Sequence, residues 1–157
     1  KPLTIGLVGE IYTLIEPYVN LNIESKLGRL GVEVHRGITL TDWIKTHLSL
    51  DMKYRQERKT MLAKAEPYLN LCIGGHAWET IASTIDFYEK GLDGIIQVLP
   101  FGCMPEIVAE SIMPTIGTDL QIPIMTLSVD ELTGEAGYMT RLEAFVDLLK
   151  QKKGKVI

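Results

Sequence analysis

The stretch that decides the fold reads Gly94-Ile95-Ile96-Gln97-Val98-Leu99-Pro100-Phe101-Gly102-Cys103-Met104-Pro105-Glu106. Its first half is a short apolar run of the kind that forms a buried strand. Gly102 permits a tight turn, and Pro105 is suited to the first turn of the helix that the following apolar positions predict. A strand that leads directly into a helix is the repeating unit of a parallel α/β sheet.

Cys103 lies at the N-terminal end of this predicted helix. Unpaired backbone N–H groups and the positive end of the helix dipole favour a thiolate there, and a thiolate binds metal ions or attacks electrophiles. The alternative is that Cys103 is a small apolar residue that fills the turn, which is the commoner role for an isolated cysteine.

Strand-like and helical segments alternate along the whole chain. We expect strands at 3–9, 32–35, 69–73, 95–99 and 124–129, and helices near 18–29, 41–65 (one helix or two), 78–90, 105–112 and 141–152. This alternation predicts an α/β domain of the Rossmann-like (flavodoxin-like) type. It would be a three-layer sandwich around a five-stranded parallel sheet of order 2-1-3-4-5.

Length and composition favour a single domain. A chain of 157 residues is long enough for a hydrophobic core, and its 46% hydrophobic and 23% charged residues are ordinary for a globular protein. The net charge of −4 argues against a nucleic-acid partner. No apolar run approaches the ~18 residues that cross a bilayer, and no signal peptide begins the chain, so we expect a cytoplasmic protein without a membrane partner.

From the cysteines and the first residue, we expect this segment to belong to a larger protein. The chain begins at Lys1 without a methionine, so we expect residues 1–157 to be one α/β domain of a larger multidomain protein. Its two cysteines do not form a Cys-x-x-Cys pair, and alone they cannot build a zinc or iron–sulfur site. Missing ligands would then lie outside this chain. Cys72, inside an apolar run, is expected to be buried.

The carboxyl ends of parallel strands meet at one edge of a sheet, where ligands bind in open α/β folds. The candidate cofactor-binding residues at this predicted edge are Glu10, Gly75, His76, Gly102, Asp130 and Glu131, and the candidate metal ligand is Cys103. Glycines let a ligand approach the backbone, whereas the acids and His76 can position polar groups or coordinate. The alternative is that the acids cap helices or form ion pairs and that His76 caps a helix or forms an ordinary hydrogen bond. We expect these residues to surround one cleft.

Several familiar enzyme motifs are absent. The turn after the first predicted strand has neither Gly-x-Gly-x-x-Gly nor a Walker lysine, which argues against an ATP or NAD phosphate cradle in this segment. The third predicted strand ends in Cys72-Ile73-Gly74, where a phosphoacceptor receiver would need an aspartate. The nucleophile elbow Gly-x-Ser-x-Gly is also absent, and we assign no catalytic residue.

A family resemblance covers about residues 3–152. It is carried by Gly9-Glu10-Ile11-Tyr12, Gly91-Leu92-Asp93-Gly94-Ile95, Pro100-Phe101-Gly102-Cys103-Met104-Pro105-Glu106, Asp130-Glu131-Leu132-Thr133-Gly134-Glu135-Ala136-Gly137 and Thr140-Arg141-Leu142-Glu143-Ala144-Phe145. These segments resemble the CoA-protein activase family, which is related to the 2-hydroxyacyl-CoA dehydratases, such as the 2-hydroxyglutaryl-CoA dehydratase subunits, and to their ATP-dependent activators.

The resemblance implies redox chemistry of anaerobic metabolism. In the related dehydratases, Rossmann-like subdomains each contribute a cysteine to a [4Fe–4S] cluster, and the activator hydrolyses ATP to inject the electron that starts radical dehydration. By position, Cys103 is then implied to be one ligand of an iron–sulfur cluster in the full-length protein. Because such a cluster normally takes four ligands, we expect the isolated domain to hold none and to be inactive, with Cys103 partly accessible.

The implied partners are other subdomains of the parent chain, an ATPase activator module and an acyl-CoA dehydratase. The alternative function is a non-redox interaction or acyl-CoA-binding module of the activator assembly, in which Cys103 merely fills the turn.

Overall fold

A computed structural model describes residues 2–48, 52–71 and 73–154. Strands and helices alternate along the chain, as the sequence predicts. In chain order they are β1 Leu3–Gly9, α1 Ile11–Ile15, α2 Ile23–Arg29, β2 Val32–Arg36, α3 Leu40–Leu48, α4 Met52–Ala63, α5 Ala77–Glu89, β3 Gly94–Pro100, α6 Met104–Asp119, β4 Ile124–Val129 and α7 Glu135–Gly154.

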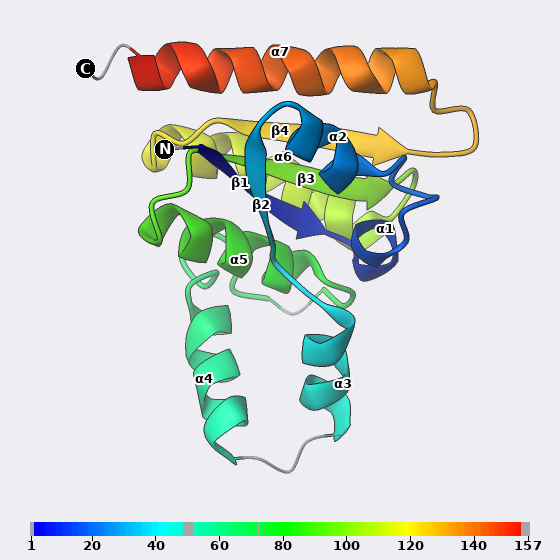
Figure 1. The fold of residues 1–157 in the computed structure, drawn as a ribbon. Coiled ribbons are helices and arrows are strands. Elements are labelled where there is room, and N and C mark those ends of the chain that lie inside the picture. Colours follow the sequence, from blue (N-terminus) through cyan, green and yellow to red (C-terminus); the bar gives the residue numbers. More distant parts are fainter. Residues whose placement is uncertain (1, 49–51, 72, 155–157) are drawn as a thin grey trace.

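The described strands form one parallel sheet of order β2-β1-β3-β4 (Figure 1). Helices α1, α2 and α7 pack on one face, and α5 and α6 pack on the other. The mixed α/β class and the parallel sheet covered by helices are therefore confirmed. From β1 the chain continues to β2 on one side of the sheet, and from β3 it continues to β4 on the other side. The strand order therefore reverses between the two central strands, β1 and β3.

A five-stranded sheet is not shown. The segment 69–73, expected to form a strand between β1 and β3, has no strand structure at residues 69–71 and 73, and Cys72 lies outside the described residues. Instead β1 pairs directly with β3, with Ile5 opposite Gly94. Leu71 and Ile73 are exposed. An apolar run alone does not distinguish a buried strand from a loop, and here the position beside β1 belongs to β3.

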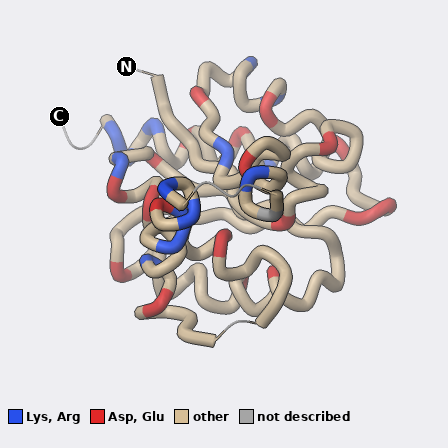
Figure 2. The backbone as a smooth tube through the Cα atoms, turned by 90° about the horizontal axis from the view of Figure 1, so that it is seen from below, with Lys and Arg blue, Asp and Glu red and all other residues tan. Residues whose placement is uncertain are grey.

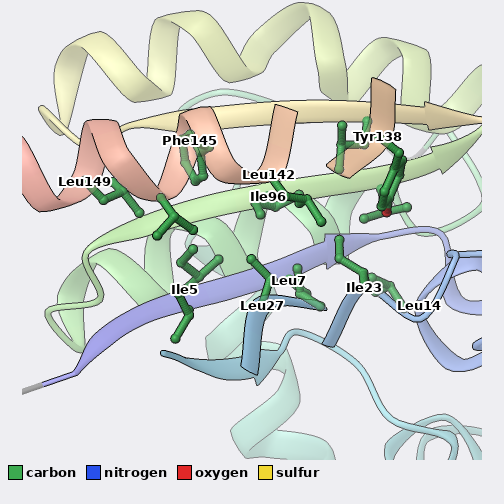
Figure 3. Packing of buried hydrophobic residues seen from close by; sticks show 14 of the residues in the cluster. Ile5, Leu7, Leu14, Ile23, Leu27, Ile96, Tyr138, Leu142, Phe145 and Leu149 are labelled. Carbon is green, nitrogen blue, oxygen red and sulfur yellow. The ribbon is translucent and has the colours of Figure 1, made fainter. Parts of the chain in front are cut away.

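The core beneath α7 follows from its apolar stripe. Leu142, Phe145 and Leu149 recur on one side of the helix and are buried against the sheet (Figure 3). They meet Ile5 of β1 and Ile96 of β3, which point to the same face of the sheet. This packing holds the carboxyl ends of the strands in a fixed arrangement.

The predicted helical stretch 41–65 is two helices, which together form a hairpin that projects beyond α5 (Figure 1). Helix α4 has no buried residue among those described. Arg58 of α4 forms an ion pair with Glu79 of α5 (2.8 Å), and Lys64, directly after α4, forms one with Asp86 of α5 (2.6 Å). Viewed from the hairpin side, lysines and arginines gather on it (Figure 2). None of the described helices has the length and apolar character needed to cross a bilayer.

Candidate functional site

Cys103 is the N-cap residue of α6, as the sequence predicts. Its backbone N–H donates to the carbonyl of Pro100 (3.1 Å), and its carbonyl accepts from Ile107 N (2.9 Å). Gly102 makes the turn possible because its φ of 79° lies in the left-handed region that favours glycine. The Cys103 side chain makes no capping hydrogen bond, and the thiol is free and partly exposed. The expected partial accessibility of Cys103 is confirmed.

The Gly75–His76 turn lies against the start of α6. A Cβ atom at Gly75 would lie 2.7 Å from Cγ of Pro105, and Gly75 has a φ of 58°. His76 is the N-cap residue of α5, and its carbonyl accepts from Thr80 N (2.8 Å). The His76 ring is partly exposed and makes no hydrogen bond within the described part of the chain. The turn is therefore placed beside the Cys103 junction by packing, although no strand precedes it.

Glu106 is the residue that the sequence analysis did not single out. It lies in the first turn of α6 and is completely buried. Its carboxylate accepts from the Thr80 hydroxyl (2.9 Å to Oε1) and from Gln97 Nε2 (3.0 Å to Oε2). Gln97 Nε2 also donates to the Glu106 carbonyl (3.1 Å), and Gln97 Oε1 accepts from the Thr126 hydroxyl (3.1 Å). The network ties the first turn of α6 to α5, β3 and β4.

Burial raises the pKa of Glu106 above the ordinary glutamate range. Hydrogen bonds from Gln97 and Thr80 lower this pKa in part, and the negative charges of Glu10 and Glu79 raise it further. The protonated form of Glu106 is therefore favoured relative to an exposed glutamate. A sequence signal for this residue does exist, because Glu106 shares the helical spacing of Ala109 and Met113 on the buried face of α6.

Glu10 acts as a helix cap, which was the alternative considered for it. Its Oε2 accepts from Thr13 N (3.0 Å) at the start of α1. Gly9 precedes it with a φ of 135°, and a Cβ there would lie 1.9 Å from the Val98 carbonyl oxygen. Only glycine allows the end of β1 to approach β3 this closely, and the approach carries Glu10 toward the Glu106 network.

A cleft of about 930 Å³ opens beyond the carboxyl ends of β3 and β4. Its rim carries three strongly exposed apolar side chains: Tyr18 (87%), Phe101 (78%) and Leu132 (84%). Asp130 and Glu131 line this cleft, whereas Glu10, Gly75, His76, Gly102 and Cys103 do not. The expected residues thus belong to the loops of the carboxyl edge, but they do not all line this cleft.

Asp130 organises its own loop. Its Oδ1 accepts from Leu132 N (3.0 Å) and from the Thr133 hydroxyl (2.8 Å), in the manner of an Asx turn. Phe101 N donates to the Val129 carbonyl (2.9 Å), so this loop is hydrogen-bonded to the segment that leads to Cys103. Glu131 is exposed on the cleft wall and makes no hydrogen bond in the described ranges.

The described residues contain no group of three His, Cys, Asp or Glu side chains placed to hold a metal ion. Within them Cys103 is the one cysteine. The expected burial of Cys72 is untested, because that residue lies outside the described ranges.

Comparison of the chain with family models, curated proteins and solved structures gives no match.

Proposed function

We propose that this chain is a domain of an ATP-dependent redox system related to the CoA-protein activases and 2-hydroxyacyl-CoA dehydratases. In this proposal Cys103 supplies one thiolate ligand to an iron–sulfur cluster of the full-length protein. The observation that carries the proposal is a free, partly exposed thiol with no capping role at the N-terminus of the 16-residue helix α6. Backbone N–H groups at a helix N-terminus stabilise negative charge on such a ligand.

The donor set fits one corner of a cluster. A [4Fe–4S] cluster takes four ligands, and the described part of this domain offers Cys103, so this proposal takes the remaining ligands from other subdomains of the parent chain. When bound, the cluster supplies one-electron transfer at low potential. An ATPase activator module and an acyl-CoA dehydratase are the proposed partners.

The role of the remaining residues is to hold Cys103 in place. Gly102 permits the turn, and the absence of a Cβ at Gly75 lets the loop before α5 pack on Pro105. The hydrogen bonds of Glu106 to Thr80 and Gln97 anchor the first turn of α6 from inside. These three contacts fix the turn that carries the thiol. The thiol is therefore preorganised to bind iron, because the turn needs no further ordering when the metal binds.

The test is anaerobic iron and sulfide analysis of the full-length protein, with electron paramagnetic resonance, on Cys103→Ser. Serine keeps a similar volume, so we expect the fold to survive while cluster iron and ATP-dependent reductase activity are lost. Cys72→Ser is the matched control and should retain both. Full iron content in Cys103→Ser would reduce Cys103 to a structural residue.

A second candidate is an acyl-CoA-binding or interaction module without redox chemistry. It is favoured by the cleft, whose exposed Tyr18 and Phe101 rings and Leu132 side chain offer an apolar surface beside the Cys103 turn. In that case Phe101→Ala would weaken acyl-CoA binding measured by calorimetry, whereas Cys103→Ser would leave it unchanged. Absence of acyl-CoA binding to the wild-type chain would eliminate this candidate.

A further inference from the structure

Strand β4 lies at an outer edge of the sheet, and no described strand pairs with its outer side. Ile95 N donates to the Pro123 carbonyl (3.0 Å), and Phe101 N donates to the Val129 carbonyl (2.9 Å). Hydrogen bonds alternate along parallel strands, so the odd-numbered residues of β4 direct their backbone groups to β3. Ile124, Thr126 and Ser128 consequently direct their N–H and C=O groups away from the sheet.

These outward-facing groups are almost all unpaired. Within the described ranges, the Thr126 carbonyl alone among them has a partner, the guanidinium of Arg141 on α7 at 2.6 Å. The strand Ile124-Met125-Thr126-Leu127-Ser128-Val129 contains neither a charged residue nor a proline. Charges and prolines are the usual means by which an edge strand avoids pairing with another chain, and β4 has neither within its own sequence.

The opposite edge is protected in the usual way. Strand β2 carries Glu33, His35 and Arg36. His35 pairs with Glu33 (3.0 Å), and Arg36 pairs with Glu24 of α2. Charged side chains on an edge strand oppose the addition of a further strand, so the two edges of this sheet differ in their capacity to pair.

A groove of about 550 Å³ runs beside β4, along α6. It is lined by Met113, Pro114 and Gly117 of α6 and by Ile124 and Thr126 of β4. Pro114 lies inside the helix and has no N–H, which leaves the Glu110 carbonyl without its usual helical donor. The groove therefore offers space for side chains of an added strand next to unpaired backbone groups.

We propose that β4 is an interface between two copies of this chain, which pair their β4 strands antiparallel about a two-fold axis at Thr126. In this arrangement Thr126 faces Thr126 of the second copy, and Ile124 faces Ser128 of the second copy. Each of these opposed residues can exchange both N–H···O=C bonds with its counterpart, at Thr126 once the guanidinium of Arg141 leaves the carbonyl. The result is one continuous sheet through both copies, and the proposal does not depend on the function proposed for Cys103.

Charge complementarity favours the antiparallel pairing of two copies. Glu110 and Lys152 line the groove, Glu110 in the first half of α6 and Lys152 near the end of α7. Because α6 begins at the carboxyl edge and Lys152 Nζ donates to Gln121 in the loop before β4, the two charges mark opposite ends of the groove. A two-fold axis then brings the acidic end of one groove beside the basic end of the other.

Arg141 competes with this pairing, because its guanidinium occupies the Thr126 carbonyl that the second copy would use. Removal of the side chain in Arg141→Ala leaves that carbonyl open to the Thr126 N–H of the second copy. The structure thus assigns Arg141 the role of limiting self-association.

The test is sedimentation equilibrium of the 157-residue chain from about 1 µM to about 1 mM, a range that spans weak to moderate dissociation constants. We expect a reversible monomer–dimer equilibrium. Ser128→Pro removes an outward-facing N–H from an exposed residue of β4 while leaving the bonds to β3, and it should weaken the dimer by about tenfold or more. Arg141→Ala should strengthen it.

Val34→Pro is the matched control on the opposite edge of the sheet. Gly37 N donates to the Leu7 carbonyl, and the backbone groups of successive residues in β2 point alternately toward and away from β1. The N–H and C=O of Val34 therefore point away from the sheet. This variant should dimerise like the wild-type chain. If circular dichroism shows that Ser128→Pro does not fold, Ser128→Lys places a charge on the same edge and should weaken the dimer instead. The proposal is overturned if the wild-type chain stays monomeric throughout, or if folded Ser128→Pro or Ser128→Lys dimerises normally. The β4 edge would then be available only to a strand of another polypeptide.

Discussion

Both faces of the sheet are packed by apolar side chains, but they differ in the polar groups that they enclose. The core beneath α7 is formed by apolar side chains, including Leu142 and Phe145, and its buried tyrosine hydroxyl at Tyr138 has no hydrogen-bond partner among the described residues. The core beneath α5 and α6 encloses the carboxylate of Glu106 with its polar partners Thr80 and Gln97. Apolar burial is the main source of folding free energy, whereas buried hydrogen bonds specify one geometry. Apolar burial on both faces therefore stabilises the domain, and the polar network of the second face also positions the helix that begins at Cys103.

The largest effect is expected beneath α7. Leu142→Ala removes a completely buried side chain and should lower the free energy of unfolding by about 2–5 kcal/mol, because apolar burial is lost and a cavity is left in the core. The measurement is urea denaturation followed by circular dichroism. Leu148→Ala on the exposed side of the same helix is the control and should change stability by about 0.5 kcal/mol or less. Equal losses in the two variants would contradict the assignment of α7 to the core.

The next effect concerns the pH dependence of the face beneath α5 and α6. Because the pKa of Glu106 is raised in the folded state, its contribution to stability is fully present below the unfolded pKa and is lost as the pH rises through the folded pKa. Each unit of pKa difference corresponds to about 1.4 kcal/mol. The free energy of unfolding should therefore fall with rising pH in the wild-type protein relative to Glu106→Gln, which mimics the protonated side chain.

The difference between the two pH profiles isolates Glu106 from other carboxylates. The pKa of Asp93, which accepts hydrogen bonds from Lys153 and Thr4, is lowered despite its burial, and it contributes stability that is lost as the pH falls. That contribution is common to both proteins and cancels. Parallel profiles for the wild-type protein and Glu106→Gln would show that Glu106 is ionised equally in the folded and unfolded states.

The smallest effect is expected at Tyr138. Its hydroxyl is buried and finds no partner in the part of the chain that the structure describes, and burial raises its pKa well above the usual tyrosine range. Tyr138→Phe removes an unsatisfied polar atom from an apolar core, so stability should rise or stay within about 1 kcal/mol of the wild type. Thermal denaturation measures the change. A loss of more than about 2 kcal/mol would mean that the hydroxyl is hydrogen-bonded in solution, for instance to a buried water.

Much of the fold and part of the candidate site can be predicted from local patterns. The apolar stripe of Leu142, Phe145 and Leu149 predicts the buried face of α7, and Gly102 with Pro105 predicts the turn that makes Cys103 an N-cap. These predictions hold because helical spacing and turn chemistry depend on residues close in sequence. The strand expected at 69–73 is not shown, since its apolar composition resembles that of a strand while β3 occupies the place beside β1.

The sequence by itself determined the parallel α/β class, the order of most elements and the position of Cys103 at a helix start. Only the tertiary structure decided that Glu106 turns inward, because its partners Thr80 and Gln97 come from other elements of the fold. It also decided that Gly75 meets Pro105 and that β4 lies at an outer edge of the sheet. Each of these outcomes depends on which distant segments pack together, and that competition is governed by the burial and hydrogen bonding of the whole chain rather than by any local run of residues.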